Sequence, residues 1–147
     1  MRQVDSLQIF NFSNPLKQAI MEMPTHAFNW VEIPVIDFNR AKTFFSRIFD
    51  YQMPESTMGN QRMGFLLYHM QSRGIGGAIV KGEGYEPSKT GPKVYLNGGT
   101  DLNTVLNRVE PAGGKIVLPK TQITPQLGYF AVFIDTEGNQ LSLHSMS

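Results

Sequence analysis

The pattern of hydrophobic and polar positions in residues 28–82 appears again in residues 93–147. In each stretch an alternating segment ends near an aspartate, Asp37 or Asp101, and apolar residues then recur at helical spacing. The side chain of Asp37 is expected to cap the first helix. Three more alternating segments follow each helix, separated by turn residues. The sequence therefore predicts two strand–helix–three-strand (βαβββ) modules in tandem, offset by 64 positions.

The expected elements can be given as ranges. The first module has strands at 28–35, 51–58, 62–70 and 76–81 and a helix at 38–49, and the second has strands at 93–97, 115–118, 128–134 and 140–145 and a helix at 102–109. Residues 83–92, rich in Gly, Pro and Lys, are expected to link module 1 (28–82) to module 2 (93–147). Residues 119–127 are expected to form a long loop that serves as a lid or pocket rim.

Residues 1–27 lie outside the repeat and are interpreted as an N-terminal extension. A short amphipathic helix is expected there, with Asn14 as its cap and Pro15 at its first position. The alternative is that translation starts at Met21 or Met23 and that the preceding residues are poorly ordered.

Composition limits the class of protein. Two halves of this size are marginal alone, so the 147-residue chain is expected to form one domain at 28–147 with a shared core. A net charge of +1 gives no electrostatic footprint for nucleic acid or an anionic membrane. The absence of cysteine excludes disulfides and thiolate sites, and with no signal-peptide pattern it favours a cytoplasmic location. The expected partner is a small organic molecule.

Three segments carry a family resemblance: WVEIPVID (30–37), VEPAGGKIVLPK (109–120) and FIDTEGNQLSLH (133–144). With the repeat, they resemble the vicinal oxygen chelate superfamily, which includes glyoxalase I, extradiol dioxygenases, fosfomycin-modifying enzymes and bleomycin-binding resistance proteins. They look most like its glyoxalase-like domain proteins of uncharacterised activity. The resemblance implies an α+β fold, with two βαβββ modules forming a curled mixed sheet and helices outside. It also implies a homodimer, whose clefts form within or across chains.

The resemblance also indicates where metal ligands would stand, two in each module. Carried over by position, they are Trp30, Ala78, Val94 and Ser142. None of these side chains is a usual ligand of a divalent metal. A shift of one residue near Gly98 would put Lys93 or Tyr95 in place of Val94, which does not restore a standard site. No metal cofactor is therefore expected.

Glu32 and His144 are the candidate chemical groups. Because strand side chains alternate, Glu32 shares a face with Trp30, and His144 shares a face with Ser142. The two groups are interpreted as a hydrogen-bonded pair, with an acid–base pair for catalysis or a displaced metal site as alternatives. Two ligands are fewer than the three or four protein ligands of a typical site.

The expected cavity combines apolar and aromatic walls with a few polar groups, as small-molecule pockets do. Its residues are Trp30, Glu32, Ala78, Val80, Tyr95, Leu96, Ser142 and His144. Trp30 offers a flat face for stacking a ring or a cation, unless it only fills the space of the missing metal. The sequence thus predicts a small-molecule-binding protein without the usual metal ligands. The alternatives are a lyase, isomerase or dioxygenase-type enzyme with an atypical metal site or the Glu32/His144 pair, and an interaction protein with a filled cavity.

Overall fold

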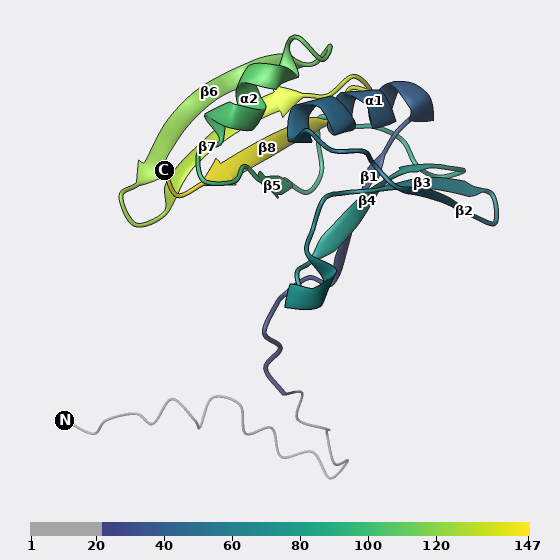
Figure 1. The fold of residues 1–147 in the computed structure, drawn as a ribbon, viewed down its shortest axis with the longest axis horizontal. Helices are drawn as coiled ribbons and strands as arrows, with labels where there is room; N and C mark the ends of the chain where they lie inside the picture. The colour runs from purple at the N-terminus through teal and green to yellow at the C-terminus, as the bar shows by residue number, and fades with distance from the viewer. Residues whose placement is uncertain (1–21) are drawn as a thin grey trace.

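The computed structural model describes residues 22–147, which form two modules (Figure 1). The first contains β1 (Trp30–Pro34), α1 (Phe38–Phe49), β2 (Glu55–Met58), β3 (Gln61–Phe65), the 3-10 turn η2 (Met70–Ser72) and β4 (Gly76–Lys81). The second contains β5 (Tyr95–Asn97), α2 (Asn103–Val109), β6 (Lys115–Thr124), β7 (Gly128–Ile134) and β8 (Gln140–Ser145). The predicted order of elements is confirmed.

The two modules have the same sheet topology. The strand orders are β1-β4-β3-β2 and β5-β8-β7-β6. The first strand of each module pairs in parallel with the last, and the other pairs are antiparallel. The α+β class and the tandem βαβββ modules are therefore confirmed. The strands form two four-stranded mixed sheets, one in each module.

Helix α1 begins as the sequence predicts. The Asp37 carboxylate accepts a hydrogen bond from the backbone N–H of Arg40 at 3.0 Å. The second module differs, because Asp101 bonds the N–H of Asn103 while Leu102 takes the capping position without a side-chain bond. Only the first helix therefore has the predicted aspartate cap.

The helix-facing sides of both sheets and the buried faces of both helices form one hydrophobic core. Its largest fully buried side chains include Phe44 and Phe45 of α1, Ile79 of β4 and Phe133 of β7. The helices lie side by side (Figure 1). The modules are thus packed together through their helix sides.

A buried carboxylate on the turn between β7 and β8 also joins the modules. Glu137 Oε1 accepts hydrogen bonds from the N–H groups of Ile36 and Asp37, at 3.0 and 2.6 Å. Glu137 Oε2 accepts from Arg40 Nε at 2.7 Å and from Thr136 Oγ1 at 3.0 Å. Burial by itself raises the pKa of Glu137, but Arg40 and the other donors outweigh it, so this pKa lies below its usual value.

Other expectations need correction or lie outside the described residues. The prediction of a long loop or lid at 119–127 is wrong, because β6 continues to Thr124 and pairs with β7. The register of this pairing shifts at three places. The N-terminal helix expected around residues 14–23 falls mainly on residues outside the described part. None of the helices in residues 22–147 is long and apolar enough to cross a membrane.

Candidate functional site

The first strand of each module pairs with the last strand of that module, and the register of this pairing differs by one residue between the two modules. The N–H of Val35 bonds the carbonyl of Val80, and the N–H of Gly98 bonds the carbonyl of His144. The donors are 63 positions apart, whereas the acceptors are 64 apart. The residue equivalent to Trp30 is therefore Lys93, which stands two residues before β5. The assignment of Val94 to that position is wrong, because the second module has one extra residue before its helix.

In the first module, Trp30 and Glu32 lie on the sheet face away from the helices. Phe65 lies edge-on to the Trp30 ring, with ring centroids 6.3 Å apart, and Tyr68 does so at 6.1 Å. The Tyr85 hydroxyl donates to Glu32 Oε2 at 2.5 Å, and this contact raises the pKa of Tyr85. An aromatic wall therefore flanks the carboxylate.

Ala78 and Val80 form the floor of the same face. Both are fully buried and, with Met63, form a small cluster separate from the main core, against which Phe65 and Tyr85 pack. The sequence correctly predicts that Ala78 and Val80 share this face with Trp30 and Glu32. It does not single out the aromatic side chains of the wall. Phe65 could have been assigned to this face because it lies two positions after Met63 in the same strand pattern. Tyr85 lies in the linker, where no periodic pattern indicates its position.

In the second module, the corresponding face carries Tyr95, Ser142 and His144. Tyr95 is the register partner of Ser142, and its ring centroid lies 6.3 Å from that of Phe130. His144 Nε2 lies 2.6 Å from the carbonyl oxygen of Leu127. Leu96 does not belong to this face. It packs against the shared core on the helix side, because neighbouring residues of a strand point to opposite faces.

In residues 22–147 the two faces belong to two separate sheets. Both sheets turn their opposite faces toward the shared core, and the Ala78–Val80 cluster contains no residue of the second module. Glu32 bonds Tyr85, and His144 bonds Leu127. No hydrogen bond joins Glu32 to His144 in the described residues, so the expected pair does not form within this chain.

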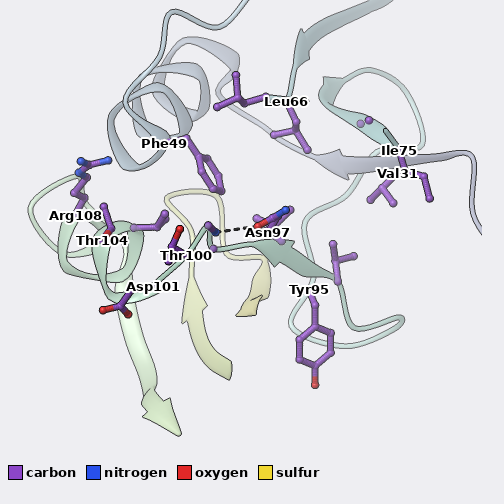
Figure 2. A pocket seen from close by; sticks show the side chains of 18 of the residues that line it. Val31, Phe49, Leu66, Ile75, Tyr95, Asn97, Thr100, Asp101, Thr104 and Arg108 are labelled. Atoms are coloured by element: carbon purple, nitrogen blue, oxygen red, sulfur yellow. Dashed lines mark hydrogen bonds between the residues drawn. The ribbon is translucent and has the colours of Figure 1, made fainter. Parts of the chain in front are cut away.

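A pocket lies between the modules on the helix side (Figure 2). Its volume is about 790 Å³. Phe49, at the end of α1, and Leu66 lie on one side of it, and Asn97 of β5 lies opposite. Of the residues expected in the cavity, only Tyr95 and Leu96 contribute to this pocket, which therefore adjoins the Tyr95 face but contains none of the side chains named above for the Trp30 face.

The donor set does not fit the family's metal. After the register correction, the four ligand positions hold an indole, a methyl group, an ammonium and a hydroxyl, at Trp30, Ala78, Lys93 and Ser142. Neutral hydroxyl is a weak ligand, and the other three groups are unsuited to a divalent ion at neutral pH. Among residues 22–147, no three His, Asp or Glu side chains form a group that could hold a metal ion.

Comparison with known proteins agrees with the topology. Residues 27–143 match the Glyoxalase/Bleomycin resistance protein/Dioxygenase superfamily. A glyoxylase-like domain-containing protein from Didymella fabae is 32% identical over 114 residues, which cover 74% of this chain and 85% of that protein.

Solved structures share the fold at low sequence identity. TnmS3, an antibiotic-binding protein from Streptomyces sp. CB03234, has a TM-score of 0.63 and 19% identity, covering 86% of this chain and all of that one. Glyoxalase I from Zea mays has a TM-score of 0.58 and 15% identity, with 80% of this chain covered. This chain spans only 43% of the maize enzyme. The chain belongs to the Glyoxalase/Bleomycin resistance protein/Dioxygenase superfamily.

Proposed function

We propose that this protein binds a small organic molecule with a flat aromatic ring, without the divalent metal of the family's enzymes. The observation that carries the proposal is the aromatic wall of Trp30, Phe65 and Tyr68, which stands where the first metal ligand would be. Trp30 is 37% exposed to solvent, so its ring can still contact a ligand. Aromatic rings contribute both large apolar area and specific stacking geometry to binding.

The polar groups on the same face would orient the ligand. Glu32 is exposed and keeps a second carboxylate oxygen beside the one that accepts from Tyr85. A carboxylate next to aromatic rings suits a ligand that carries an N–H donor or a positive charge. An antibiotic-binding protein of the same fold provides a precedent for binding without implying the same ligand.

The proposed site is completed by a second copy of the chain. The Trp30 face and the Tyr95 face belong to different modules and are not joined in one chain, and Tyr95 is 54% exposed. A two-fold dimer that sets the Trp30 face of one copy against the Tyr95 face of the other would produce two equivalent closed cavities. The homodimer is thus part of the proposal, and a cytoplasmic location is compatible with the cysteine-free sequence.

The test uses Trp30 as a reporter, because it is the only tryptophan of the chain. Proflavine, a planar cation, and anthraquinone-2-sulfonate, a planar anion, would be titrated by calorimetry and by tryptophan fluorescence, with and without a chelator. We expect proflavine to bind better than the anion, to quench Trp30 and to be unaffected by chelation. Trp30→Ala should weaken binding about fivefold or more, since ring stacking contributes roughly 1–3 kcal/mol.

Matched variants separate stacking from general loss of structure. Trp30→Phe keeps an aromatic face and should retain most of the affinity, whereas Ile36→Ala removes an exposed apolar side chain between β1 and α1 and should have no effect. Equal affinity in Trp30→Ala and the wild type would overturn the proposal. Stoichiometric metal retained after dialysis against nickel, zinc, iron and manganese would overturn the metal-free part of it.

A further inference from the structure

We infer that the pocket between the modules is a second ligand site, which takes an organic acid with an apolar body. This pocket lies on the helix side of both sheets, opposite the face that carries Trp30. The pocket shares Tyr95 with the face that the proposed dimer sets against Trp30, but Trp30 itself lies outside it, so the inference does not rest on ligand binding at Trp30. It rests on the apolar walls of the pocket and on an arginine at its edge.

The walls come from both modules and are mainly apolar. Val31 of β1 and Leu66, which follows β3, belong to the first module, and Val94 and Leu96 to the second. Leu66, Val94 and Leu96 also pack on the shared core, so these walls are held in place by buried residues. A volume of about 790 Å³ lies within the range of roughly 300–1,000 Å³ that is usual for small-molecule pockets.

Arg108 of α2 supplies the charge. Its guanidinium donates one hydrogen bond to the carbonyl oxygen of Ile48 at 3.2 Å, near the end of α1. This bond uses one of the five N–H donors of an arginine. In residues 22–147 no carboxylate lies within ion-pair distance of the guanidinium, and the guanidinium donates no other hydrogen bond. Arg108 is partly buried at the edge of the pocket, where an anion would gain a bidentate partner.

The nearby carboxylate does not cancel this positive charge. Asp101 also lines the pocket, but Lys120 Nζ lies 2.8 Å from its Oδ1 and lowers its pKa, as does the N–H of Asn103. The charges of Asp101 and Lys120 offset each other. The guanidinium of Arg108 therefore gives this part of the pocket a net positive charge. Thr104, one turn before Arg108, presents a hydroxyl on the same side of the pocket (Figure 2). Together they favour a carboxylate or sulfonate head with its apolar body along the walls.

Two probes of equal length test the charge. Decanoate and decan-1-ol have the same apolar chain and differ in the head group, and their binding would be measured by calorimetry on the full chain. We expect decanoate to bind at least about tenfold more tightly, which corresponds to one charge-assisted hydrogen-bonded contact. Arg108→Gln should remove this preference, whereas Arg108→Lys should restore part of it.

Further variants show that the effect arises in this pocket. Thr104 is an exposed helical residue at the pocket wall, so Thr104→Phe should fold normally and block both probes. Arg47→Gln removes an exposed cation of α1 outside the pocket and should leave decanoate binding unchanged. Trp30→Phe should also leave it unchanged, which separates this site from the proposed aromatic one.

Three results would overturn the inference. Equal affinity for decanoate and decan-1-ol would show that Arg108 does not recognise an anion. Decanoate binding that persists in Thr104→Phe would place the ligand elsewhere. A wild-type dimer that Thr104→Phe converts to monomer, seen by analytical ultracentrifugation, would mean that a second copy of the chain and not a small molecule covers the pocket.

Discussion

Replacing Glu137 by glutamine should destabilise the whole domain, because this single carboxylate of the second module accepts hydrogen bonds from residues at the start of α1. The Glu137 side chain is fully buried and accepts four hydrogen bonds. Glutamine has nearly the same shape and keeps one carbonyl oxygen, which can still accept from the N–H groups of Ile36 and Asp37. The other oxygen becomes an NH₂ group that faces the guanidinium of Arg40, so a donor meets a donor.

The magnitude follows from these contacts. Two backbone bonds change from a charged to a neutral acceptor, with a loss of roughly 0.5–1 kcal/mol each. The Arg40 side chain is 53% exposed and can be solvated, so losing the ion pair adds less than the two backbone bonds do. The Thr136 hydroxyl can rotate to accept from the new amide. We therefore expect the free energy of unfolding to fall by about 2 kcal/mol at pH 7.

The effect should depend on pH with a definite sign. The pKa of Glu137 is lowered in the folded state, so its ionised form stabilises the fold above the usual value of 4.5 and this contribution is lost as the pH falls. Asp135 has the opposite shift: burial is the main cause of its raised pKa, and the charge of Glu137 adds a smaller part, which Glu137→Gln removes. The destabilisation should therefore be full at pH 7 and smaller at pH 3.5, which lies below the usual pKa of 4.5.

Urea denaturation at pH 7 and pH 3.5, followed by tryptophan fluorescence at a fixed protein concentration, measures both differences. Glu83→Gln makes the same chemical change at an exposed residue of the linker and should change the unfolding free energy by less than about 0.5 kcal/mol. The reasoning fails if Glu137→Gln is as stable as the wild type at pH 7, or if its destabilisation is the same at both pH values.

Three further changes test other parts of the structure. Phe133→Ala should lower the unfolding free energy by about 3–5 kcal/mol in urea denaturation, because this fully buried ring lies in the core that both modules share. Gly77→Ala should lower it by about 1–3 kcal/mol, since the new Cβ would lie 2.5 Å from the carbonyl oxygen of Val31. Glu32→Gln should lower the pKa of Tyr85, whose pKa is raised chiefly by its hydrogen bond to Glu32, and titration of tyrosine absorbance at 295 nm would show it.

Matched controls accompany these changes. Met58→Ala removes a side chain that is 61% exposed and should have little effect on stability, in contrast to Phe133→Ala. At Gly74 the nearest atom to an added Cβ is 3.3 Å away, so Gly74→Ala should be tolerated better than Gly77→Ala. Tyr51 also has a raised pKa, but burial causes it, so Glu32→Gln should leave the titration of Tyr51 unchanged. Equal effects of test and control variants would contradict the respective explanation.

The sequence specified local structure better than the arrangement of the modules. Residues 76–81 and 140–145 match β4 and β8 in full, because a run of small and apolar residues (76–81) and an alternating segment (140–145) are bounded there by turn residues. The loop expected at 119–127 is largely strand, because its Thr, Gln and Pro residues resemble a loop in composition while β7 supplies a pairing partner. Pairing with a distant strand is a tertiary effect that overrides local preference.

The candidate site shows the same limit. Alternation alone placed Glu32 beside Trp30, and the structure agrees. The same rule excluded Leu96 from the face of Tyr95, and applying it would have avoided that error. The sequence could not show that the helix sides of both modules meet, because that depends on how the two halves pack. For this reason neither the separation of the two faces nor the pocket at Arg108 was predicted.

The one-residue difference between β1 and β5 also limits how this protein could be redesigned. An engineer guided by the repeat would introduce histidines at Trp30 and Val94 to recreate a symmetric metal centre. Val94, however, faces the helix side and lines the pocket between the modules, so its new imidazole would point away from the intended partners. Side-chain replacement at the 64-residue spacing therefore cannot recover the symmetry. Such a design must target Lys93, or first delete one residue between β5 and α2.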